Sequence, residues 1–409
     1  MMTATQTRPT DIRQAVILCG GIGSRLGALT EAALKPLLPV AETPFLERLL
    51  FEIGRFGLDR ILFLAAHRAD DIRAFAAEAC PRLGLTFEIA VEPDRAGTGG
   101  ALWHARDHLD PVFFLFNGDS WFDVNLLDLA TRLEPDDLAV LALREVEDAA
   151  RYGTVTVDGP RVRRFAEKTG SSAPGLVNGG IYVVRRDLVD ALSPSCSLEA
   201  NGLAPLAETG RIAGRRYDGF FIDIGIPSDF ERAQHAIPAA QRRPAVFLDR
   251  DGVLNEDRHY VGEIERFCWL PGAQEAVKTL NDAGVFVFVV TNQAGVARGF
   301  YDEAAVNRLH AFMQAELRTI GAHIDAFRYC PYHPDGTVLA YARPSDWRKP
   351  APGMILDLLS HWPVDTARSF LVGDQDHDVA AAHAAGLAGY KIAGGESLDE
   401  LVRARLASA

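Results

Sequence analysis

Hydrophobic residues in this chain gather in short continuous runs. Such runs occupy residues 15–19, 112–116, 138–143, 245–248 and 285–290. A continuous apolar run of about four to eight residues is typical of a strand that is covered on both faces. We therefore predict a buried β-strand at each of these positions.

Stretches with helical spacing of hydrophobic positions lie between these runs. They occupy residues 44–56, 69–80 and 303–320. Helices that alternate with buried strands predict an α/β fold, with a mainly parallel sheet in each half of the chain. In such a fold, ligands bind at the carboxyl ends of the strands.

The alternation of predicted strands and helices is interrupted at residues 237–244 and then begins again. Residues 237–244 contain two prolines and two arginines without apolar periodicity, and a predicted strand follows them directly. The chain has 409 residues, which is more than one hydrophobic core usually organises. We expect two domains, residues 1–240 and residues 241–409.

The composition narrows the class of protein. A hydrophobic content of 48% with 24% charged residues is typical of a soluble globular protein. No apolar run approaches the roughly 20 residues of a membrane span, so we expect no membrane partner. Five scattered cysteines favour a reducing, cytoplasmic location over a disulfide framework. The net charge of −13 argues against nucleic acid as a partner.

The first predicted strand leads into a glycine-rich loop. Gly20, Gly21 and Gly23 leave room for backbone N–H groups to approach phosphate oxygens, and Arg25 can add charge-assisted hydrogen bonds. Lys35 follows at a distance that could bring it to the same phosphates. Lysine is rare here, with 5 Lys among 42 basic residues, so each Lys is a candidate for a specific role.

The loop GGIGSRL and the following LKPLLPV resemble the signature of the sugar-1-phosphate nucleotidyltransferases. Further blocks match the same family in order: EPDRAGTGGA, LFNGD, EK, NGGIY and FIDIG. The resemblance covers roughly residues 14–237. It implies a Rossmann-like mixed sheet, and transfer of a nucleotidyl group from a nucleoside triphosphate to a sugar 1-phosphate with release of pyrophosphate.

The resemblance also implies roles for single residues. Asp119 and Asp223 would hold Mg²⁺, while Arg25 and Lys35 would steady the leaving pyrophosphate. Taken alone, Asp119 could be a turn carboxylate and Asp223 a helix cap; the order of the blocks favours the catalytic reading. The positions that would bind the nucleotide, sugar and phosphates are Gly20, Gly21, Gly23, Glu92, Gly97, Thr98, Gly99, Lys168, Asn178 and Gly179.

The predicted strand at residues 245–248 ends in a D-x-D sequence. Two carboxylates at a strand end can take different parts: Asp249 can attack phosphorus, and Asp251 can protonate the leaving oxygen and later activate water. A D-x-D sequence alone is often only a turn. Thr291 at a later strand end and Lys349 could hold the oxygens of the transferred phosphoryl group.

LDRDGVLNED, TNQAGVARGF, WRKPAPGM and VGDQDHD together resemble the four motifs of the haloacid dehalogenase superfamily of phosphatases, without a large cap insert. The finer resemblance is to the heptose bisphosphate phosphatases, with the histidinol phosphatases as close relatives. It implies a doubly wound parallel sheet and Mg²⁺ held by Asp249, Asp374 and the backbone carbonyl of Asp251. The residues that would contact the substrate are Thr291, Asn292, Gln293, Arg298, Arg348 and Lys349.

Relatives in this family usually carry a zinc loop with four Cys or His ligands. In this chain only Cys330 and His333 remain, and residues 344–347 offer neither type. Two such ligands do not complete a tetrahedral site. We therefore expect Mg²⁺ in both domains and no zinc.

The two resemblances describe successive steps in the activation of one sugar. The expected function is removal of the 7-phosphate from D-glycero-D-manno-heptose 1,7-bisphosphate, followed by transfer of GMP from GTP to the heptose 1-phosphate. Alternatives are another sugar bisphosphate or nucleotide, a phosphatase half of the histidinol-phosphate type, or a non-catalytic sensor of nucleotide sugars. Sequence reasoning leaves the base, the sugar, the anomer and the oligomeric state open.

Overall fold

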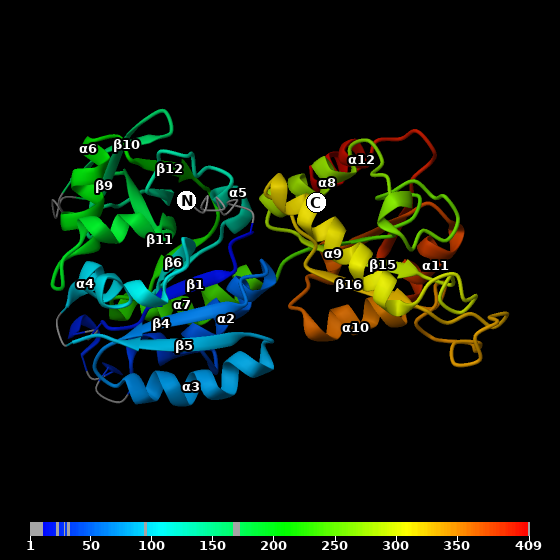
Figure 1. Cartoon of the computed structure of the whole chain (residues 1–409), viewed down its shortest axis with the longest axis horizontal. Helices are drawn as coiled ribbons and strands as arrows, with labels where there is room; N and C mark the ends of the chain where they lie inside the picture. The colour runs from blue at the N-terminus through cyan, green and yellow to red at the C-terminus, as the bar shows by residue number, and fades with distance from the viewer. Residues whose placement is uncertain are drawn as a thin grey trace, which may run out of the picture. The chain divides into compact units, whose positions relative to one another are not determined.

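The computed structural model describes residues 11–21, 24–27, 29–30, 33–93, 96–166 and 172–407. The chain divides into two compact units, the first ending at Ala240 and the second beginning at Gln241 (Figure 1). Each unit combines β-sheet with helices, which confirms the predicted two-domain α/β class.

The first unit is built around a mixed sheet. Among the described residues it has nine strands in the spatial order β5-β4-β1-β6-β11-β8-β12-β10-β9. These strands are β1 (Gln14–Leu18), β4 (Arg60–Ala65), β5 (Thr86–Val91), β6 (Val112–Asn117), β8 (Ala139–Val146), β9 (Thr154–Asp158), β10 (Arg161–Ala166), β11 (Gly175–Arg185) and β12 (Ile212–Arg216). Strands β5, β4, β1 and β6 run parallel, whereas β11 is antiparallel to both β6 and β8.

This sheet is less parallel than the alternation of strands and helices predicted. Antiparallel pairs cause the difference: β11 runs antiparallel to β6 and β8, and β9 and β10 form a hairpin with Gly159 in the left-handed conformation at its turn. No helix separates these two strands, so they pair antiparallel. The mixed sheet that the family resemblance implied is the correct description.

Two small sheets and a set of helices complete the first unit. The small sheets pair β2 (Pro39–Val40) with β3 (Thr43–Pro44), and β7 (Ser120–Phe122) with β13 (Phe221–Asp223). The helices are α2 (Phe45–Arg55), α3 (Ala69–Arg82), α4 (Gly97–His104), α5 (Leu126–Ala130), α6 (Ala204–Glu208) and α7 (Pro227–Gln241).

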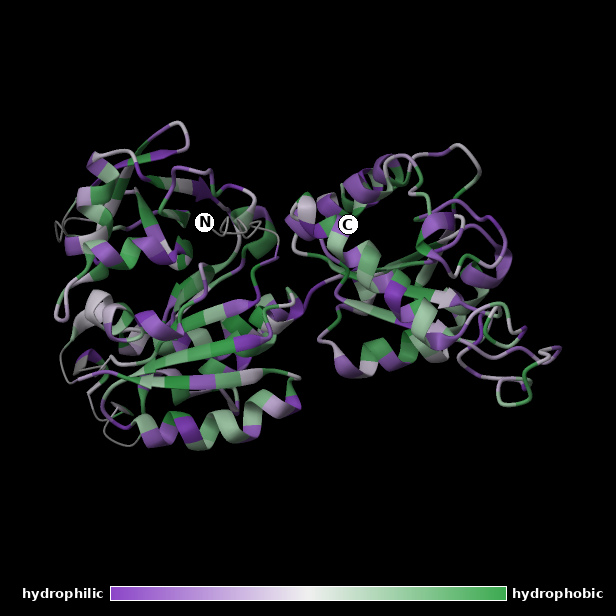
Figure 2. Cartoon of the chain, in the orientation of Figure 1, coloured by the Kyte–Doolittle hydropathy of each residue, from purple (hydrophilic) through white to green (hydrophobic). Residues whose placement is uncertain are grey.

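Alternate residues of one strand enter different hydrophobic cores. Ala15 and Ile17 of β1 pack with α2, α3 and α7, whereas Val16 packs on the opposite face with α4. Figure 2 shows the strands as largely hydrophobic ribbons between helices that carry hydrophilic stretches. Because both faces are covered, these strands have continuous apolar sequences.

The second unit has a parallel sheet in the order β16-β15-β14-β17-β18. Helices α8, α9 and α12 cover one face, and α10 and α11 cover the other, as predicted for a doubly wound sheet. The elements are β14 (Ala245–Leu248), α8 (Ala273–Asp282), β15 (Phe286–Asn292), α9 (Glu303–Thr319), β16 (Ala326–Cys330), α10 (Gly353–His361), β17 (Phe370–Gly373), α11 (Asp376–Ala384), β18 (Ala388–Lys391) and α12 (Leu398–Leu406).

The segment expected to lack regular structure between the units is partly helical. Helix α7 continues through Pro238 to Gln241. Ile237 is fully buried in the core of the first unit, so packing holds the last turn of the helix in place. Irregular backbone is therefore confined to the three residues before β14.

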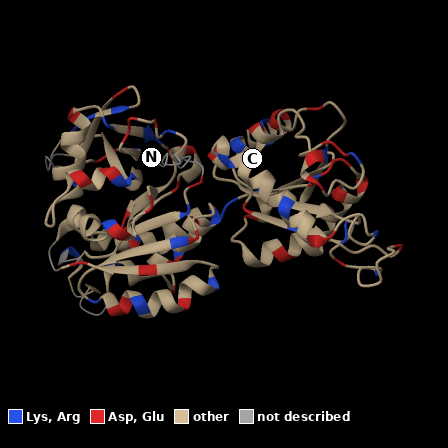
Figure 3. Ribbon diagram, in the orientation of Figure 1, with Lys and Arg blue, Asp and Glu red and all other residues tan. Residues whose placement is uncertain are grey.

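The surfaces of both units carry charges of both signs. Figure 3 shows Lys and Arg interspersed with Asp and Glu over helices and loops. In the part of the chain that the structure describes, every helix is too short or too polar to cross a lipid bilayer.

Candidate active sites

The first candidate site is a cavity at the carboxyl end of β1. It has a volume of about 570 Å³ and is lined by residues that follow β1, β4, β5 and β6, together with the start of α4. Close backbone approach requires glycine at Gly118, where a Cβ atom would lie 2.5 Å from the carbonyl oxygen of Leu18; at Gly20 a Cβ atom would lie 2.3 Å from the carboxylate atom Oε1 of Glu92. The predicted phosphate loop at Gly20 and Gly21 thus opens into a real cavity.

Two predicted metal-binding aspartates meet at one end of this cavity. Asp223 pairs with Ser120 across β13 and β7, and the N–H of Ile224 donates to the carbonyl of Asp119 at 3.0 Å. This small sheet brings the two carboxylates together although they lie far apart in the sequence.

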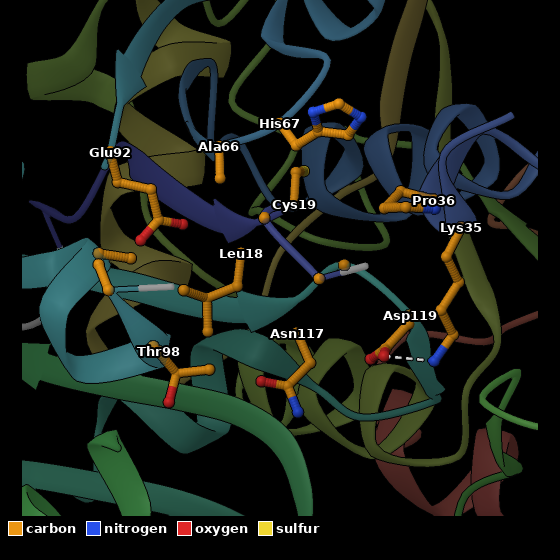
Figure 4. Close-up of a pocket in the computed structure, with 16 residues that line it drawn as sticks. Leu18, Cys19, Lys35, Pro36, Ala66, His67, Glu92, Thr98, Asn117 and Asp119 are labelled. Atoms are coloured by element: carbon orange, nitrogen blue, oxygen red, sulfur yellow. Dashed lines mark hydrogen bonds and ion pairs between the residues drawn. The ribbon is translucent and has the colours of Figure 1, made fainter. Parts of the chain in front are cut away.

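Lys35 forms ion pairs with both of these carboxylates. Its Nζ atom contacts Oδ2 of Asp119 and lies 3.5 Å from Oδ1 of Asp223 (Figure 4 shows the Asp119 contact). Burial raises the pKa of Asp223 and the neighbouring Asp119 raises it further, while Lys35 opposes the shift. Two carboxylates face one ammonium group, so negative charge is left over. This donor set fits Mg²⁺, which prefers carboxylate oxygens.

The opposite end of the cavity holds a second, isolated carboxylate. Glu92 follows β5, and its Oε2 atom is buried without a hydrogen-bond partner among the described residues. Burial raises the pKa of Glu92 to about 7. In Figure 4, Glu92 and Thr98 lie on the side of the cavity away from Asp119 and Lys35. A buried acceptor with no protein partner is available to a ligand.

The glycines at the start of α4 have a packing role as well. A Cβ atom at Gly97 would lie 2.5 Å from the carbonyl oxygen of Cys196, and one at Gly99 would lie 2.6 Å from its Sγ. Gly97 and Thr98 line the cavity, whereas Gly99 faces Cys196. The oxygen of Thr98 accepts from the N–H of Leu198 at 3.0 Å, which ties α4 to this segment.

The remaining expected residues of the first unit lie apart from the cavity wall. Asn178 donates to the hydroxyl of Tyr182 at 2.8 Å, and a Cβ atom at Gly179 would collide with the ring of Phe122. Arg25 is exposed, and its charge helps to lower the pKa of Asp223 against the upward effect of burial. Gly23 and Lys168, both expected to bind phosphate groups, lie outside the described residues.

The second candidate site begins at Asp249, the first residue after β14. Lys349 lies 2.9 Å from its Oδ1 atom and 2.6 Å from Oδ1 of Asp378, and also donates to the carbonyl of Val290 at 2.8 Å. All three charged side chains are buried. Burial raises the pKa of Asp249, and Lys349 counteracts that shift. Lys349 is therefore placed to steady a phosphoryl group on Asp249.

Asp251 is held by three side chains. Arg250 and Gln293 each donate to its Oδ2 atom at 2.9 Å, and Asn255 donates to Oδ1 at 2.9 Å. The next residue, Gly252, has φ +87°, and a Cβ atom there would lie 2.5 Å from Oδ2 of Asp374. Asp374 thus approaches the backbone beside Asp251.

The oxygens near Asp249 and Asp374 suit a hard divalent cation. Asp249 follows β14 and Asp374 follows the neighbouring strand β17; these carboxylates and the carbonyl of Asp251 are oxygen donors of the kind that fits Mg²⁺. A second set, Asp249, His377 and Asp378, lies within 4.8 Å among the described residues. Lys349 forms ion pairs with both of these carboxylates, as Lys35 does with the two carboxylates of the first site.

The substrate residues expected at the end of β15 divide into two kinds. Thr291 is buried, and Asn292 makes a reciprocal pair of hydrogen bonds with the backbone of Lys349 at 3.0 and 3.1 Å. Gln293 is only 1% exposed, and its amide nitrogen donates hydrogen bonds to Asp251 and Thr291. Its side chain therefore positions these two residues. Sequence reasoning missed this, because a motif does not show which way an amide points.

Arg298 and Arg348 have guanidinium nitrogens that remain available. The Nε atom of Arg298 and the Nη1 atom of Arg348 are buried without hydrogen-bond partners among the described residues. Burial lowers the pKa of Arg348, and the like charge of Arg298 adds to that effect. Two unpaired cations at one place indicate a site for an anion.

Hydrogen bonds between side chains and backbone hold the loop that carries Cys330 and His333. The hydroxyls of Tyr329 and Tyr341 donate to the two carboxylate oxygens of Glu303 at 2.8 and 2.7 Å. His333 accepts from the N–H of Asp335 through Nδ1 at 3.0 Å. These contacts join the loop to the first residue of α9.

Comparison with known proteins distinguishes the two units. A family model described as nucleotidyl transferase matches residues 14–239, and one described as HAD-hydrolase-like matches residues 346–408. The solved structure of HddC from Yersinia pseudotuberculosis is 28% identical, with a TM-score of 0.50, and covers 55% of this chain and 100% of its own. HddC has also been solved in complex with GMP-PN.

Two curated relatives of the second unit have the same protein name. D-glycero-beta-D-manno-heptose-1,7-bisphosphate 7-phosphatase of Rhodopseudomonas palustris is 53% identical over 165 residues, which is 40% of this chain and 91% of the relative. The protein of the same name from Escherichia coli K12 is 42% identical over 146 residues, 36% of this chain and 76% of the relative.

Proposed function

Because the chain belongs to the nucleotidyl transferase family over residues 14–239 and joins this part to a member of the heptose-bisphosphate phosphatase family, we propose that it performs two successive reactions on one sugar. The second unit removes the 7-phosphate of D-glycero-D-manno-heptose 1,7-bisphosphate. The first unit then transfers GMP from GTP to the heptose 1-phosphate. The observation that carries the proposal is that each unit has a buried lysine shared between two carboxylates, at least one of which lies at the end of a strand.

The phosphatase step follows from the positions of two carboxylates. Asp249 attacks the phosphorus of the 7-phosphate, a new P–O bond forms on its carboxylate, and the bond from phosphorus to the sugar oxygen breaks. Asp251 gives that oxygen a proton, and then takes one from the water that hydrolyses the aspartyl phosphate. Lys349 and Thr291 hold the phosphoryl oxygens. Mg²⁺ at Asp249, Asp374 and the Asp251 carbonyl supplies further charge neutralisation when bound.

The second phosphate of a bisphosphate has a suitable place in this site. Arg298 and Arg348 offer unpaired N–H groups, which a phosphate dianion satisfies. A monophosphate would leave both guanidinium groups without a partner. We therefore assign the sugar 1-phosphate to these two arginines.

In the first unit, an oxygen of the heptose 1-phosphate attacks the α-phosphorus of GTP and pyrophosphate leaves. The main obstacle is repulsion between two anions. Lys35 and Arg25 offset the charge of the leaving group, and Asp119 and Asp223 would hold Mg²⁺, which would neutralise further phosphate charge. Lys168 would hold the attacking phosphate, by resemblance alone.

Guanine suits Glu92 better than the other bases do. An ionised carboxylate accepts hydrogen bonds on both oxygens, and guanine presents two adjacent donors, N1–H and the N2 amino group. Binding of guanine would give the buried carboxylate of Glu92 two hydrogen bonds in place of none, and this gain favours GTP. The complex of HddC with GMP-PN supports the same base. We place both reactions in the cytoplasm, where all five free cysteines stay reduced.

One experiment tests both steps. Purified protein with Mg²⁺ is given either anomer of the heptose 1,7-bisphosphate together with each nucleoside triphosphate, and phosphate, pyrophosphate and product mass are followed. We expect phosphate release, then pyrophosphate and a GDP-heptose with GTP only. Asp249→Asn protein should lose phosphate release but still use heptose 1-phosphate. Absence of any nucleotide sugar from either anomer would refute the assignment of the first unit.

A further inference from the structure

Gln293 has an amide whose orientation is fixed from two sides. Its Oε1 atom accepts from Arg250 at 3.0 Å and from the hydroxyl of Tyr301 at 2.7 Å. Its Nε2 atom donates to Oδ2 of Asp251 at 2.9 Å and to the hydroxyl oxygen of Thr291 at 2.8 Å. Arg250 can only donate, so a flipped amide would turn its NH₂ group toward the Arg250 donor and lose that hydrogen bond.

This arrangement directs two groups that touch the substrate. Asp251 receives a hydrogen bond on Oδ2, which fixes the plane of its carboxylate. The oxygen of Thr291 accepts from Gln293, so the hydroxyl proton of Thr291 is free to point at a phosphoryl oxygen.

The ring of Tyr301 packs closely against two glycines. A Cβ atom at Gly262 or at Gly295 would lie within 2.3 Å of its ring, so the ring fits only where these side chains are absent. Burial raises the pKa of Tyr301 to about 12, so the hydroxyl keeps its proton near pH 7. Tyr301 also lies two residues before the start of α9, outside the four sequence motifs.

We propose that Tyr301 is a positioning residue for the phosphatase reaction, acting through Gln293 on Asp251 and Thr291. The hydroxyl of Tyr301 restrains the Gln293 amide, and that amide holds the proton donor in line with the leaving sugar oxygen. This inference rests on the proposed phosphatase function of the second unit.

The test compares two leaving groups. A sugar alkoxide needs a proton from Asp251 as it leaves, whereas p-nitrophenolate leaves without one. Tyr301→Phe keeps the ring and removes the hydroxyl. We expect kcat/KM for the heptose 1,7-bisphosphate to fall about tenfold, the effect of one lost hydrogen bond, and kcat/KM for p-nitrophenyl phosphate to change less than about twofold.

Gly295→Ala provides an independent variant, because its Cβ displaces the ring while the hydroxyl remains. It should reproduce the selective loss. Tyr390→Phe, in the edge strand β18, is the matched control and should leave both rates unchanged.

An equal fall for both substrates in Tyr301→Phe, or no fall for the sugar phosphate, would overturn the proposal. Wild-type protein that hydrolyses p-nitrophenyl phosphate but no heptose bisphosphate would instead refute the proposed substrate. In that case the other alkyl phosphates that the wild-type protein cleaves replace the sugar in the same comparison, so the two failures remain distinct.

Discussion

The ammonium nitrogen of Lys349 lies 2.9 Å from the carboxylate of Asp249, and the side chains of both residues are less than a tenth exposed. Burial alone lowers the pKa of Lys349, but Asp249 and Asp378 outweigh it and the net shift is upward. Lys349 therefore stays charged, and it is the counter-ion of Asp249 and Asp378 in the second candidate site.

Lys349→Met leaves Asp249 and Asp378 buried without their cation. We expect loss of phosphate release and a destabilisation of about 3–5 kcal/mol, typical for removal of one partner from a buried ion pair. Thermal unfolding and a phosphate assay measure both effects. Lys278→Met is the control: Lys278 pairs with Asp282 at the surface, and its removal should cost less than about 1 kcal/mol. Similar stability of the two variants would contradict the central role of Lys349.

Asp119→Asn and Asp223→Asn should each lower nucleotidyl transfer by at least about 100-fold, because each removes one of two carboxylates that converge at the cavity end. Phosphate release from the bisphosphate should not change in either variant. Pyrophosphate release from heptose 1-phosphate and GTP is the measurement. Asp218→Asn, at a fully exposed carboxylate of the same unit, should behave as wild type. Equal activity of all three variants would remove the aspartate pair from the reaction.

Glu92 makes the use of GTP dependent on pH. Its pKa of about 7 means that the carboxylate is mostly protonated below pH 7 and ionised above it. The ionised form accepts both guanine donors, so kcat/KM for GTP should rise with pH and level off above about pH 8. Glu92→Gln should lower kcat/KM for GTP about 10- to 100-fold and flatten this profile.

Glu88→Gln is the matched control for Glu92, since Glu88 lies on β5, the strand that Glu92 follows, and contacts His108 at the surface. It should retain the wild-type profile. The Glu92→Gln protein should also gain thermal stability over wild type at pH 8 but not near pH 4, because the raised pKa of Glu92 costs stability only as the pH rises from 4.5 to about 7. A wild-type pH profile in Glu92→Gln would show that another group recognises the base.

Arg298→Ala and Arg348→Ala test whether these two arginines bind the second phosphate of the bisphosphate. Each variant should raise KM for the bisphosphate about 10- to 100-fold, the range for a hydrogen bond to a charged group. The effect on a sugar monophosphate should be much smaller, because it lacks the second anion. Arg343→Ala, which removes a guanidinium stacked on Tyr332, should affect both substrates equally and little. Equal effects on mono- and bisphosphates would place the second phosphate elsewhere.

Removal of divalent metal should abolish both activities, and Mg²⁺ alone should restore both. We expect no fall in the unfolding temperature of the second unit with a zinc chelator, because Glu303 already joins Tyr329 and Tyr341. Glu303→Gln should lower that temperature instead. Zinc bound stoichiometrically by the purified protein, with loss of stability on its removal, would contradict this expectation.

The sequence predicted the strands well because their apolar runs report burial on both faces. The runs at residues 15–19 and 245–248 correspond to β1 and β14, and both lead directly into the candidate sites. The position of the candidate sites could also be predicted, because the carboxyl ends of neighbouring parallel strands meet at one edge of a sheet.

Features decided by tertiary contacts were beyond sequence reasoning. The apparent linker at residues 237–244 contains Pro238, yet burial of Ile237 keeps the helix intact to Gln241. Gln293 was expected to contact substrate, but its amide is enclosed by Tyr301 and Arg250. The convergence of Lys35 with both aspartates depends on a two-stranded sheet too short to show any periodicity.

The scarcity of lysine has a practical consequence for labelling. Of the lysines that the structure describes, Lys35 and Lys349 are 7% and 1% exposed, whereas Lys391 is 48% exposed and pairs only with the fully solvated Asp376. An amine-reactive dye at low excess should therefore mark Lys391 well before either buried ammonium group. A fluorophore or surface tether could be attached at the end of β18 while both reactions continue to run.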